Sequence, residues 1–305
     1  MKHRYVIYGL IAAVAMIVAA CSNSDVAATV NGTEITNEEV ADLRSAPVGN
    51  TADGEQVRGD LTTLIVAQAT VDAAEEDYGI SGLDTDEARE AYLAQASPSE
   101  LSVLDSISQN PELGPGAADV VLTQLAVRSA VVEAISNDPE LLVGVWEEQR
   151  DLLTQVCVRH IVVPEQAEAQ AAYDRIVGGE SFGDVADEVS RDDRSPGGQL
   201  QCPASPSDYV EPFATVVATT DVGVVTEPFE TEFGWHVVIV DERSLPTSYE
   251  ELVADPQRWV PDVVVQGVWS TWRDSAVSRA DVAVRSQIGR WFPSGDGILP
   301  PPESP

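Results

Sequence analysis

The pattern of the chain changes at residues 156–163, which read VCVRHIVV. This run is rich in β-branched residues and is followed at once by Pro164, which is typical of a strand. Upstream, apolar residues recur at helical spacing, most clearly over residues 57–78, where Gly79 ends the pattern. The run therefore predicts the first strand of a second module, which follows a helical first half.

The second module alternates helical and strand patterns around one long loop. Its order β-α-α-loop-α-β-β is typical of an α+β domain and differs from that of a doubly wound sheet. The predicted elements are helices at 165–177, 181–189 and, interrupted near Pro212, 207–218, a loop at 190–206, and closing strands at 224–227 and 235–241 around a turn at 232–234.

The two ends of the chain are predicted to form one mostly helical domain around this module. A hairpin at residues 27–36 turns at an Asn-Gly step, and a capping box at Thr36 begins a helix. Near the C-terminus, a long helix over 247–279, kinked or divided by Pro261, precedes a strand at 281–285. A lone helix and strand cannot bury their apolar faces, so we expect them to pack on the N-terminal half. Further helices are predicted at 85–96, from Ser97 onward, at 117–136 and from 138 towards 153.

The first residues have the features of an export signal. A positive start at residues 2–4 precedes an apolar run, residues 6–20, which is short for a membrane helix and suits a secretory segment. The run ends in Val-Ala-Ala-Cys at residues 18–21, which resembles the lipobox of bacterial lipoproteins. That resemblance implies a signal peptide at residues 1–20, diacylation of Cys21, and lipid anchoring at the extracytoplasmic face of the cell membrane. The alternatives are an uncleaved anchor or a simple signal peptide, in which Cys21 is incidental.

The composition limits the partners of the protein. A net charge of −34 over 305 residues repels phosphate, which argues against nucleic acid and against anionic lipid headgroups. A hydrophobic content of 44% excludes wholesale disorder, so the charge must lie on the surface of packed cores. The length is enough for two domains.

The cysteines support export. With Cys21 assigned to lipid, Cys157 and Cys202 remain as an even pair in an oxidising compartment, where we expect a disulfide. Two free buried thiols are the alternative. The pair also forms, with His160 and His236, a zinc-like set of two cysteines and two histidines. Cys202 has no Cys-x-x-Cys partner and export favours the disulfide, so we expect neither a metal nor a cofactor.

His160 and His236 are the only histidines after the export signal, and each lies in a segment typical of one family. Residues 158–163 and 233–238 resemble the opening and closing strands of parvulin-type peptidyl-prolyl isomerases. The resemblance covers residues 155–243 and implies a parvulin-like domain, a small antiparallel sheet wrapped by helices. The segments between these strands that follow the family's order are 179–186, 190–192, 197–200, 212–213 and 221–228.

The resemblance implies roles for individual residues. His160 and His236 would form a mutually hydrogen-bonded pair at the floor of the site, and Asp192 would face the substrate carbonyl. These three are the expected catalytic residues. The substrate-binding positions that the resemblance implies are Leu200 and Phe213 as walls of the proline pocket, Tyr209 where the family commonly has methionine, Thr231 as support for the histidine pair, and Phe233.

Such a site suits the reaction. The barrier to X-Pro rotation, about 18–20 kcal/mol, comes from amide resonance. Because no covalent bond is broken, the reaction needs no nucleophile and no metal. It needs an apolar cup for the proline ring and polar surroundings that favour the twisted amide.

The rest of the chain resembles foldase lipoproteins and periplasmic chaperones of the PrsA and SurA kind, through the segment at residues 30–36. This implies a foldase acting on unfolded or newly exported, proline-containing polypeptides. One alternative is a parvulin-fold holdase with little turnover, and another is a structural envelope lipoprotein. The predicted domains are 1–20 signal peptide, 21–154 helical chaperone-like domain, 155–243 parvulin-type domain, 244–292 C-terminal helix and strand, and 293–305 mobile Pro-rich tail.

Overall fold

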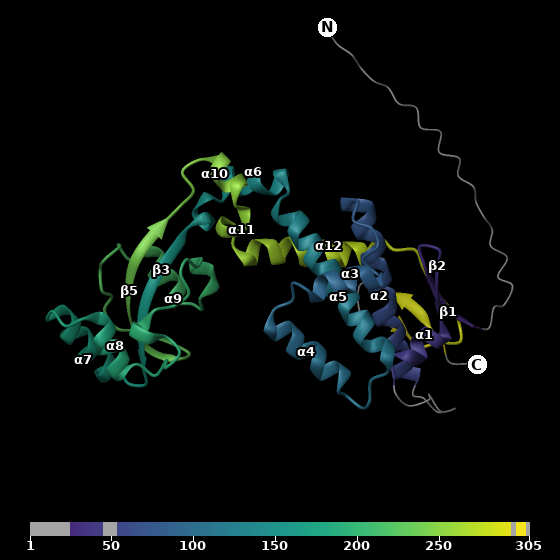
Figure 1. Ribbon diagram of the computed structural model, residues 1–305, viewed down its shortest axis with the longest axis horizontal. Coiled ribbons are helices and arrows are strands. Elements are labelled where there is room, and N and C mark those ends of the chain that lie inside the picture. The colour runs from purple at the N-terminus through teal and green to yellow at the C-terminus, as the bar shows by residue number, and fades with distance from the viewer. Residues whose placement is uncertain (1–24, 45–53, 294–296, 303–305) are drawn as a thin grey trace, which may run out of the picture.

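The computed structural model describes residues 25–44, 54–293 and 297–302, so the predicted signal peptide and Cys21 lie outside the described residues. Figure 1 shows two lobes along the longest axis. Residues 155–244 form one, called here the sheet lobe, and the rest of the described chain forms the helical lobe. The lobes meet where two long strands approach helices α6 (Pro139–Glu148) and α10 (Tyr249–Ala254). Within the described residues, no helix is long and apolar enough to cross a membrane.

Side-chain caps set the starts of several helices in the helical lobe. Thr36 accepts a hydrogen bond from the amide of Glu39, whose carboxylate accepts one from the amide of Thr36. Ser97 and Glu100 form the same reciprocal box. The helices of the N-terminal half are α1 (Asn37–Asp42), α2 (Gly54–Tyr78), α3 (Asp86–Leu93), α4 (Pro98–Ser108), α5 (Pro115–Ser136), α6 and the 3₁₀ turn Arg150–Leu153.

The C-terminal part returns to the N-terminal helices. Helix α12 (Asp262–Arg279) packs against α2 and α5, and the indole of Trp272 donates a 2.7 Å hydrogen bond to the carboxylate of Asp77 on α2. Buried Trp259 shares an apolar core with Val131 and Ile135 of α5. The helical lobe is therefore discontinuous in sequence, and the sheet lobe is inserted into it.

The expected long helix over 247–279 is three helices in the structure. They are α10, α11 (Pro256–Trp259) and α12. Pro261 divides the helix, as one of the two expectations had it, and Pro256 breaks it a second time. Each break has the same cause, because the residue before a proline is pushed out of the α region and proline lacks the amide for an intrahelical bond.

A small sheet joins the two ends of the described chain. Strand β1 (Val26–Val30) pairs antiparallel with β2 (Thr33–Thr36) on one side and with β6 (Val282–Val284) on the other. Buried Val30 and Ile35 belong to the same apolar core as Leu61 of α2. The sheet is thereby fixed to the longest helix of the lobe.

The predicted mobile tail at 293–305 is wrong for part of its length. Strand β8 (Gly297–Leu299) pairs antiparallel with β7 (Arg290–Phe292), and Ile298 is buried in the core around α2. Gly297 has a φ of +75° and lies so close to α2 that a Cβ would be 2.7 Å from the side chain of Thr62. Burial of the apolar Ile298 stabilises this strand, which composition alone did not indicate.

The sheet lobe contains a three-stranded antiparallel sheet in the order β3-β5-β4. Helices α7 and α8 cover one face, in a core around Ile161 and Val237. Helix α9 covers the other face, in a core around Val158 and Val238. The elements are β3 (Gln155–Val163), α7 (Gln166–Val177), α8 (Phe182–Val189), α9 (Phe213–Thr219), β4 (Phe229–Thr231) and β5 (Gly234–Ser244).

One closing strand lies elsewhere than predicted. Residues 224–227 are not a strand, and the edge strand is β4, which follows Pro228. The amide of Thr226 donates to the carbonyl of Val238, so the segment does run beside β5. The amide of Val238, however, donates to the side-chain hydroxyl of Thr226 instead of to a backbone carbonyl, and no regular ladder forms. The helix expected at 207–218 is also shorter, because a 3₁₀ turn precedes α9.

Candidate active site

The two histidines are brought together by the pairing of β3 with β5. His160 lies opposite Val238 and His236 lies opposite Val162, so the histidines are diagonal neighbours across the two strands. Because side chains alternate along a strand, both point to the face that α9 covers, and both are buried. Their rings are stacked, with centroids 5.7 Å apart and planes inclined by 26°.

The predicted hydrogen bond between the histidines is wrong for this structure. The Nε2 atom of His160 lies 3.0 Å from a carboxylate oxygen of Asp192, and the Nε2 atom of His236 lies 2.8 Å from the hydroxyl of Thr231. The two Nδ1 atoms have no hydrogen-bond partner among the described residues. Each ring is held from outside the pair, and stacking takes the place of the expected bond.

Asp192 is held as a carboxylate by three donors. The hydroxyl of Ser195 donates to it at 2.7 Å, the amide of Arg194 at 3.2 Å, and the ring of His160 completes the set. These bonds, that of Ser195 foremost, lower the pKa of Asp192 below its usual value. An ionised carboxylate only accepts hydrogen bonds, so His160 carries its proton on Nε2 and leaves a lone pair on Nδ1.

Burial keeps both imidazoles neutral near pH 7. Desolvation lowers the pKa of His160, although the neighbouring Asp192 opposes the effect. Desolvation, with a smaller contribution from His160, lowers the pKa of His236 to about 4. The contact between His160 and Asp192 is accordingly a hydrogen bond from a neutral ring to a carboxylate.

An aromatic cluster lies against the histidine pair. The ring of Phe213 is 5.3 Å from that of His236 and 6.0 Å from that of His160, nearly perpendicular to both. Phe229 stacks on His236 with centroids 5.6 Å apart, and Leu200 packs against the same core. The sequence interpretation placed Leu200 and Phe213 at the site but missed Phe229, for which only an aromatic residue directly after Pro228 could have been a signal.

Tyr209 packs directly on the ring of Phe213. Their centroids are 5.0 Å apart, and Phe213 is only 4% exposed. The hydroxyl of Tyr209 is buried and has no hydrogen-bond partner among the described residues, and burial raises its pKa to about 12. The ring of Phe213 is thus covered in part by the ring of Tyr209, which carries a hydroxyl group.

Thr231 and Phe233 lie at the turn between β4 and β5. The hydroxyl of Thr231 bonds His236 and accepts a hydrogen bond from the amide of Phe233 at 3.1 Å. The side chain of Phe233 is 67% exposed and points away from the core. Of the predicted substrate-binding positions, Phe233 is therefore the one that the structure does not bring into the aromatic cluster.

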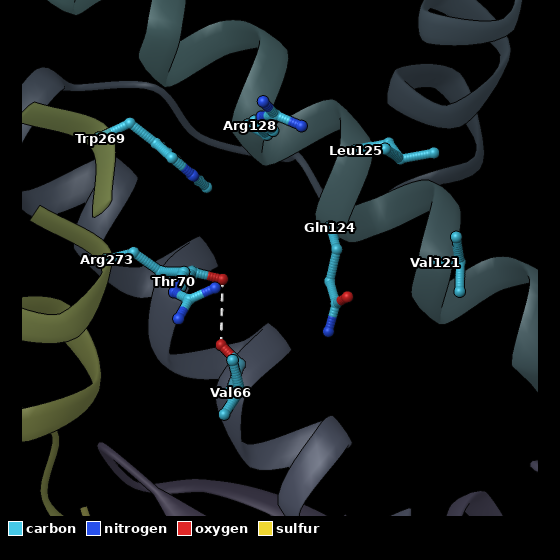
Figure 2. Close-up of a pocket in the computed structure, with 8 residues that line it drawn as sticks. All are labelled: Val66, Thr70, Val121, Gln124, Leu125, Arg128, Trp269 and Arg273. Carbon is cyan, nitrogen blue, oxygen red and sulfur yellow. Dashed lines mark hydrogen bonds between the residues drawn. The ribbon is translucent and has the colours of Figure 1, made fainter. Parts of the chain in front are cut away.

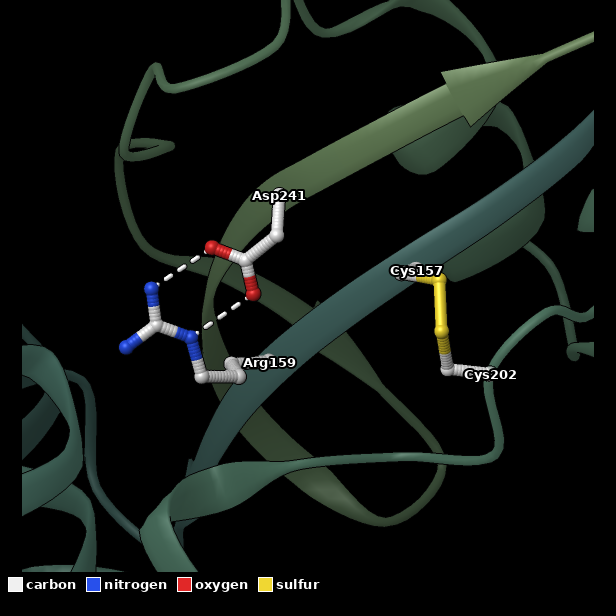
Figure 3. The surroundings of a disulfide bond; sticks show 4 residues. All are labelled: Cys157, Arg159, Cys202 and Asp241. Carbon is white, nitrogen blue, oxygen red and sulfur yellow. Dashed lines mark hydrogen bonds and ion pairs between the residues drawn. A yellow bond between two sulfur atoms is a disulfide. The ribbon is translucent and has the colours of Figure 1, made fainter.

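The loop that carries Asp192 and Leu200 is fastened to β3. The amide of Leu200 donates to the carbonyl of Val158 at 3.1 Å, and Cys202 is joined to Cys157 of β3 by a disulfide, as Figure 3 shows. Since a disulfide sulfur is not a thiolate, this pairing leaves no cysteine ligand for the zinc alternative.

A second contact in Figure 3 joins the two long strands. Arg159 of β3 forms a bidentate ion pair with Asp241 of β5, at 2.6 and 2.7 Å. Arg159 alternates with its neighbours along β3, so its guanidinium lies on the opposite face of the sheet from His160. The ion pair therefore joins the two strands in the register that aligns the histidines and lies outside the site.

This arrangement can bind a proline ring and polarise its surroundings without covalent chemistry. Phe213 and Phe229 pack on two neutral imidazoles, one of which is bonded to a carboxylate, and Tyr209 packs on Phe213. A twisted X-Pro amide has lost conjugation and carries less negative charge on its carbonyl oxygen. A carboxylate near that oxygen therefore disfavours the planar amide more than the twisted one.

Comparisons with known proteins identify the sheet lobe. Residues 163–242 match the family described as "Rotamase: PPIC-type PPIASE domain". The chain is 26% identical over 263 residues to the foldase protein PrsA of Halalkalibacterium halodurans, covering 83% of this chain and 76% of that protein. It is 39% identical over 111 residues to the chaperone SurA of Pseudomonas putida, covering 33% of this chain and 26% of that protein.

The relatives differ in how much of them this chain matches. About a quarter of that SurA chaperone is spanned, against about three quarters of the PrsA foldase. A solved structure of PrsA from Bacillus anthracis is similar over 72% of this chain and 96% of that one, with 17% identity and a TM-score of 0.42, a level that adds nothing to the assignment. On the sequence matches, residues 163–242 form a PPIC-type peptidyl-prolyl isomerase domain, of the parvulin kind, in a chain homologous to the PrsA foldase and the SurA chaperone.

Proposed function

We propose that the protein is an extracytoplasmic foldase that catalyses cis–trans isomerisation of X-Pro bonds in exported polypeptides. The observation that carries the proposal is the placing of Phe213 against two buried, neutral histidines, one of them bonded to the ionised Asp192. The partly buried rings of Tyr209 and Phe229, which pack on Phe213, offer an apolar contact for proline. The histidines and Asp192 act as electrostatic and structural elements around the rotating bond, and none of them has to exchange a proton.

Refolding of a client tests this role. A disulfide-free protein whose refolding is limited by a native cis-proline has a slow phase of tens of seconds, which an isomerase shortens at substoichiometric amounts. We expect the slow phase to accelerate with the wild-type chain and to remain slow with Asp192→Asn. Asp193→Asn is the matched control, since it makes the same substitution at the adjacent, exposed aspartate. If the rate of the slow phase is unchanged when the wild-type chain is added, the proposal is wrong.

A second candidate function is a holdase in which the isomerase fold binds clients with little turnover. The observation that favours it is that Phe213 is only 4% exposed, with Tyr209 among the side chains packed on its ring. A holdase suppresses the aggregation of an unfolded client at stoichiometric amounts and leaves the slow proline phase unchanged. The same refolding experiment therefore separates the two candidates.

The location of the protein forms part of the proposal. An apolar run ending in Val-Ala-Ala-Cys supports processing after Ala20 and lipid attachment at Cys21. The Cys157–Cys202 disulfide suits the oxidising surroundings that export provides. We expect the wild-type chain in the membrane fraction, and Cys21→Ala in the soluble fraction or as an unprocessed precursor. Intact-mass analysis without a diacylglycerol increment would contradict lipid attachment.

A further inference from the structure

A hollow of about 250 Å³ lies in the helical lobe between α2, α5 and α12. These helices come from distant parts of the sequence, so the hollow exists only once both ends of the chain have packed together. Figure 2 shows the side chains around an open centre. The lining residues are Val66, Thr70, Val121, Gln124, Leu125, Arg128, Trp269 and Arg273.

The hollow combines an apolar wall with positive charge. Val121 and Leu125 of α5 and Trp269 of α12 supply apolar surface, and the guanidinium groups of Arg128 and Arg273 flank the centre in Figure 2. The hydroxyl of Thr70 donates to backbone carbonyls of its own helix. The polar groups left facing the hollow are therefore the guanidinium groups of the two arginines and the side-chain amide of Gln124.

Two arginines facing one hollow are unusual in this chain, whose net charge is −34. Some other arginines are held by partly buried carboxylates, as in the pairs Arg44–Asp60 at 2.7 Å and Arg159–Asp241 at 2.6 Å. Arg128 instead donates a 2.8 Å hydrogen bond to the neutral amide of Gln266. Most of its donor capacity remains available to a ligand.

Two ionised acidic groups lie near the arginines, and among the described residues neither forms a buried ion pair with them. Arg273 contacts Asp274 at 3.1 Å, but both side chains are more than half exposed, at 53% and 72%, and such a pair contributes little. Glu100 interacts electrostatically with Arg128, and its carboxylate accepts hydrogen bonds from the hydroxyls of Ser97 and Tyr92. A carboxylate brought into the hollow would meet two cations without a strongly bound competitor.

The hollow continues beyond Arg273. A second hollow, of about 720 Å³, shares Val66 and Arg273 with the first and extends along α12 to Trp291 and Pro293. The two form one groove, called here the arginine groove, which runs from α5 towards the β7–β8 hairpin. A groove that continues past its charged centre suits an extended chain segment better than a chain end.

We infer that the arginine groove binds an extended client segment in which an Asp or Glu side chain lies next to apolar residues. The carboxylate would be held between Arg128 and Arg273, and the apolar neighbours would pack on Leu125, Val121 and Trp269. This inference rests on the proposed role with exported clients. It adds a binding site some distance in sequence from the isomerase domain, with a chemistry that the isomerase site lacks.

A peptide-exchange experiment on the whole mature chain tests the groove. The probe is an eight-residue peptide of alternating Leu and Glu, acetylated and amidated so that only side chains are charged, and its match replaces Glu with Gln. Fluorescence anisotropy should show the Glu peptide binding at least about tenfold more tightly, which corresponds to about 1.4 kcal/mol. Its affinity should fall with added salt, because the contact is ionic and partly exposed.

Variants assign the preference to the groove. Arg128→Gln with Arg273→Gln should remove the preference for Glu, while Arg290→Gln should keep it. Arg290 is exposed on β7 and lies outside the lining of both hollows. Equal affinity of the wild-type chain for the Glu and Gln peptides overturns the inference and needs no variant, so misfolding cannot hide that result. A preference that survives the double substitution also overturns it.

Two further measurements distinguish binding of an internal segment from binding of a chain end, and peptide binding from isomerase activity. A Gln peptide with a free carboxyl terminus that binds as tightly as the amidated Glu peptide would show capture of a chain end, which contradicts binding of an internal segment. Proline isomerisation of a short peptide is measured on the same samples. Turnover without a Glu preference overturns the inference alone, and a Glu preference without turnover overturns only the isomerase proposal.

Discussion

His160 and His236 stack face to face, 5.7 Å between ring centroids, while each bonds a different partner on the outside of the pair. Asp192 holds one ring and Thr231 holds the other. Since the Nδ1 atoms lack partners among the described residues, each ring is oriented by a single hydrogen bond together with the rings packed against it. That dependence makes the two outer partners sensitive points of the site.

Thr231→Val should lower kcat/KM for a prolyl peptide between about two- and tenfold. The substitution removes the hydroxyl that bonds His236 at 2.8 Å, and a neutral hydrogen bond contributes about 0.5–1.5 kcal/mol. Thr219→Val is the control, because its exposed hydroxyl bonds only the carbonyls of its own helix. Unchanged turnover in Thr231→Val would mean that the ring needs no such support.

Tyr209→Phe should stabilise the protein by about 1 kcal/mol or leave its stability unchanged. The hydroxyl of Tyr209 is buried without a partner among the described residues, and a buried unpaired polar group costs free energy. Urea unfolding measures the difference. A loss of more than about 1 kcal/mol would show that the hydroxyl has a hydrogen-bond partner, such as an ordered water.

Tyr209→Met should raise turnover. The flexible methionine can move aside from Phe213, on which the tyrosine ring now packs at 5.0 Å. We expect a lower KM for a prolyl peptide, since more of the Phe213 ring becomes available. A KM that rises would show that Tyr209 itself contacts substrate.

Folding stability should fall as the pH is lowered from about 6.5 to about 4. Folded His236 has a pKa of about 4, below the 6.5 of a free histidine, and the pKa of His160 is lowered in the same direction. Between these pH values the histidines are protonated in the unfolded chain but not in the folded chain. The free energy of unfolding is therefore highest above pH 6.5 and falls as the pH is lowered below it. His236 alone accounts for about 2–4 kcal/mol.

The contribution of His236 is isolated by comparing slopes. Denaturant unfolding of wild type and of His236→Gln at several pH values between 7.5 and 4.5 should give a shallower decline for the variant. Carboxylates titrate in both proteins and cancel in the comparison. Parallel declines would mean that His236 keeps an ordinary pKa in the folded chain.

Loss of the disulfide should cost about 2–4 kcal/mol of stability. Cys157 and Cys202 are 45 residues apart, and a cross-link over such a loop reduces the freedom of the unfolded chain substantially. Cys157→Ser with Cys202→Ser and the wild-type chain after thiol reduction should unfold at the same, lower denaturant concentration. No response of the wild-type chain to reduction would contradict a bridge in the folded protein.

The sequence predicted the sheet lobe well because its signals are local. His160 and His236 each lie in a β-rich segment, and pairing two such strands antiparallel forces the histidines together. The loop contacts of Ser195 and the packing of Phe229 were missed, since they depend on the path of an irregular loop and on which edge strand forms. The bond between the histidines was predicted wrongly because ring orientation follows from partners that no spacing reveals.

The helical lobe shows the same division. Caps at Thr36 and Ser97 are readable, because the cap and its partner are three residues apart. The packing of Ile298 against α2 cannot be predicted in this way, because the composition of a Pro-rich tail does not indicate which core its residues join. The arginine groove likewise arises from three helices that only the fold brings together.

We propose that the sheet lobe isomerises X-Pro bonds at the site that contains His236 and Asp192. The most direct measurement is the rate of cis–trans exchange of a prolyl tetrapeptide by NMR, with the wild-type chain and with His236→Ala combined with Asp192→Ala. We predict catalysed exchange by the wild-type chain and a rate reduced at least tenfold in the double variant, with the circular dichroism spectrum retained. Exchange no faster than in buffer, or exchange unchanged by the double substitution, would show that these residues do not catalyse isomerisation.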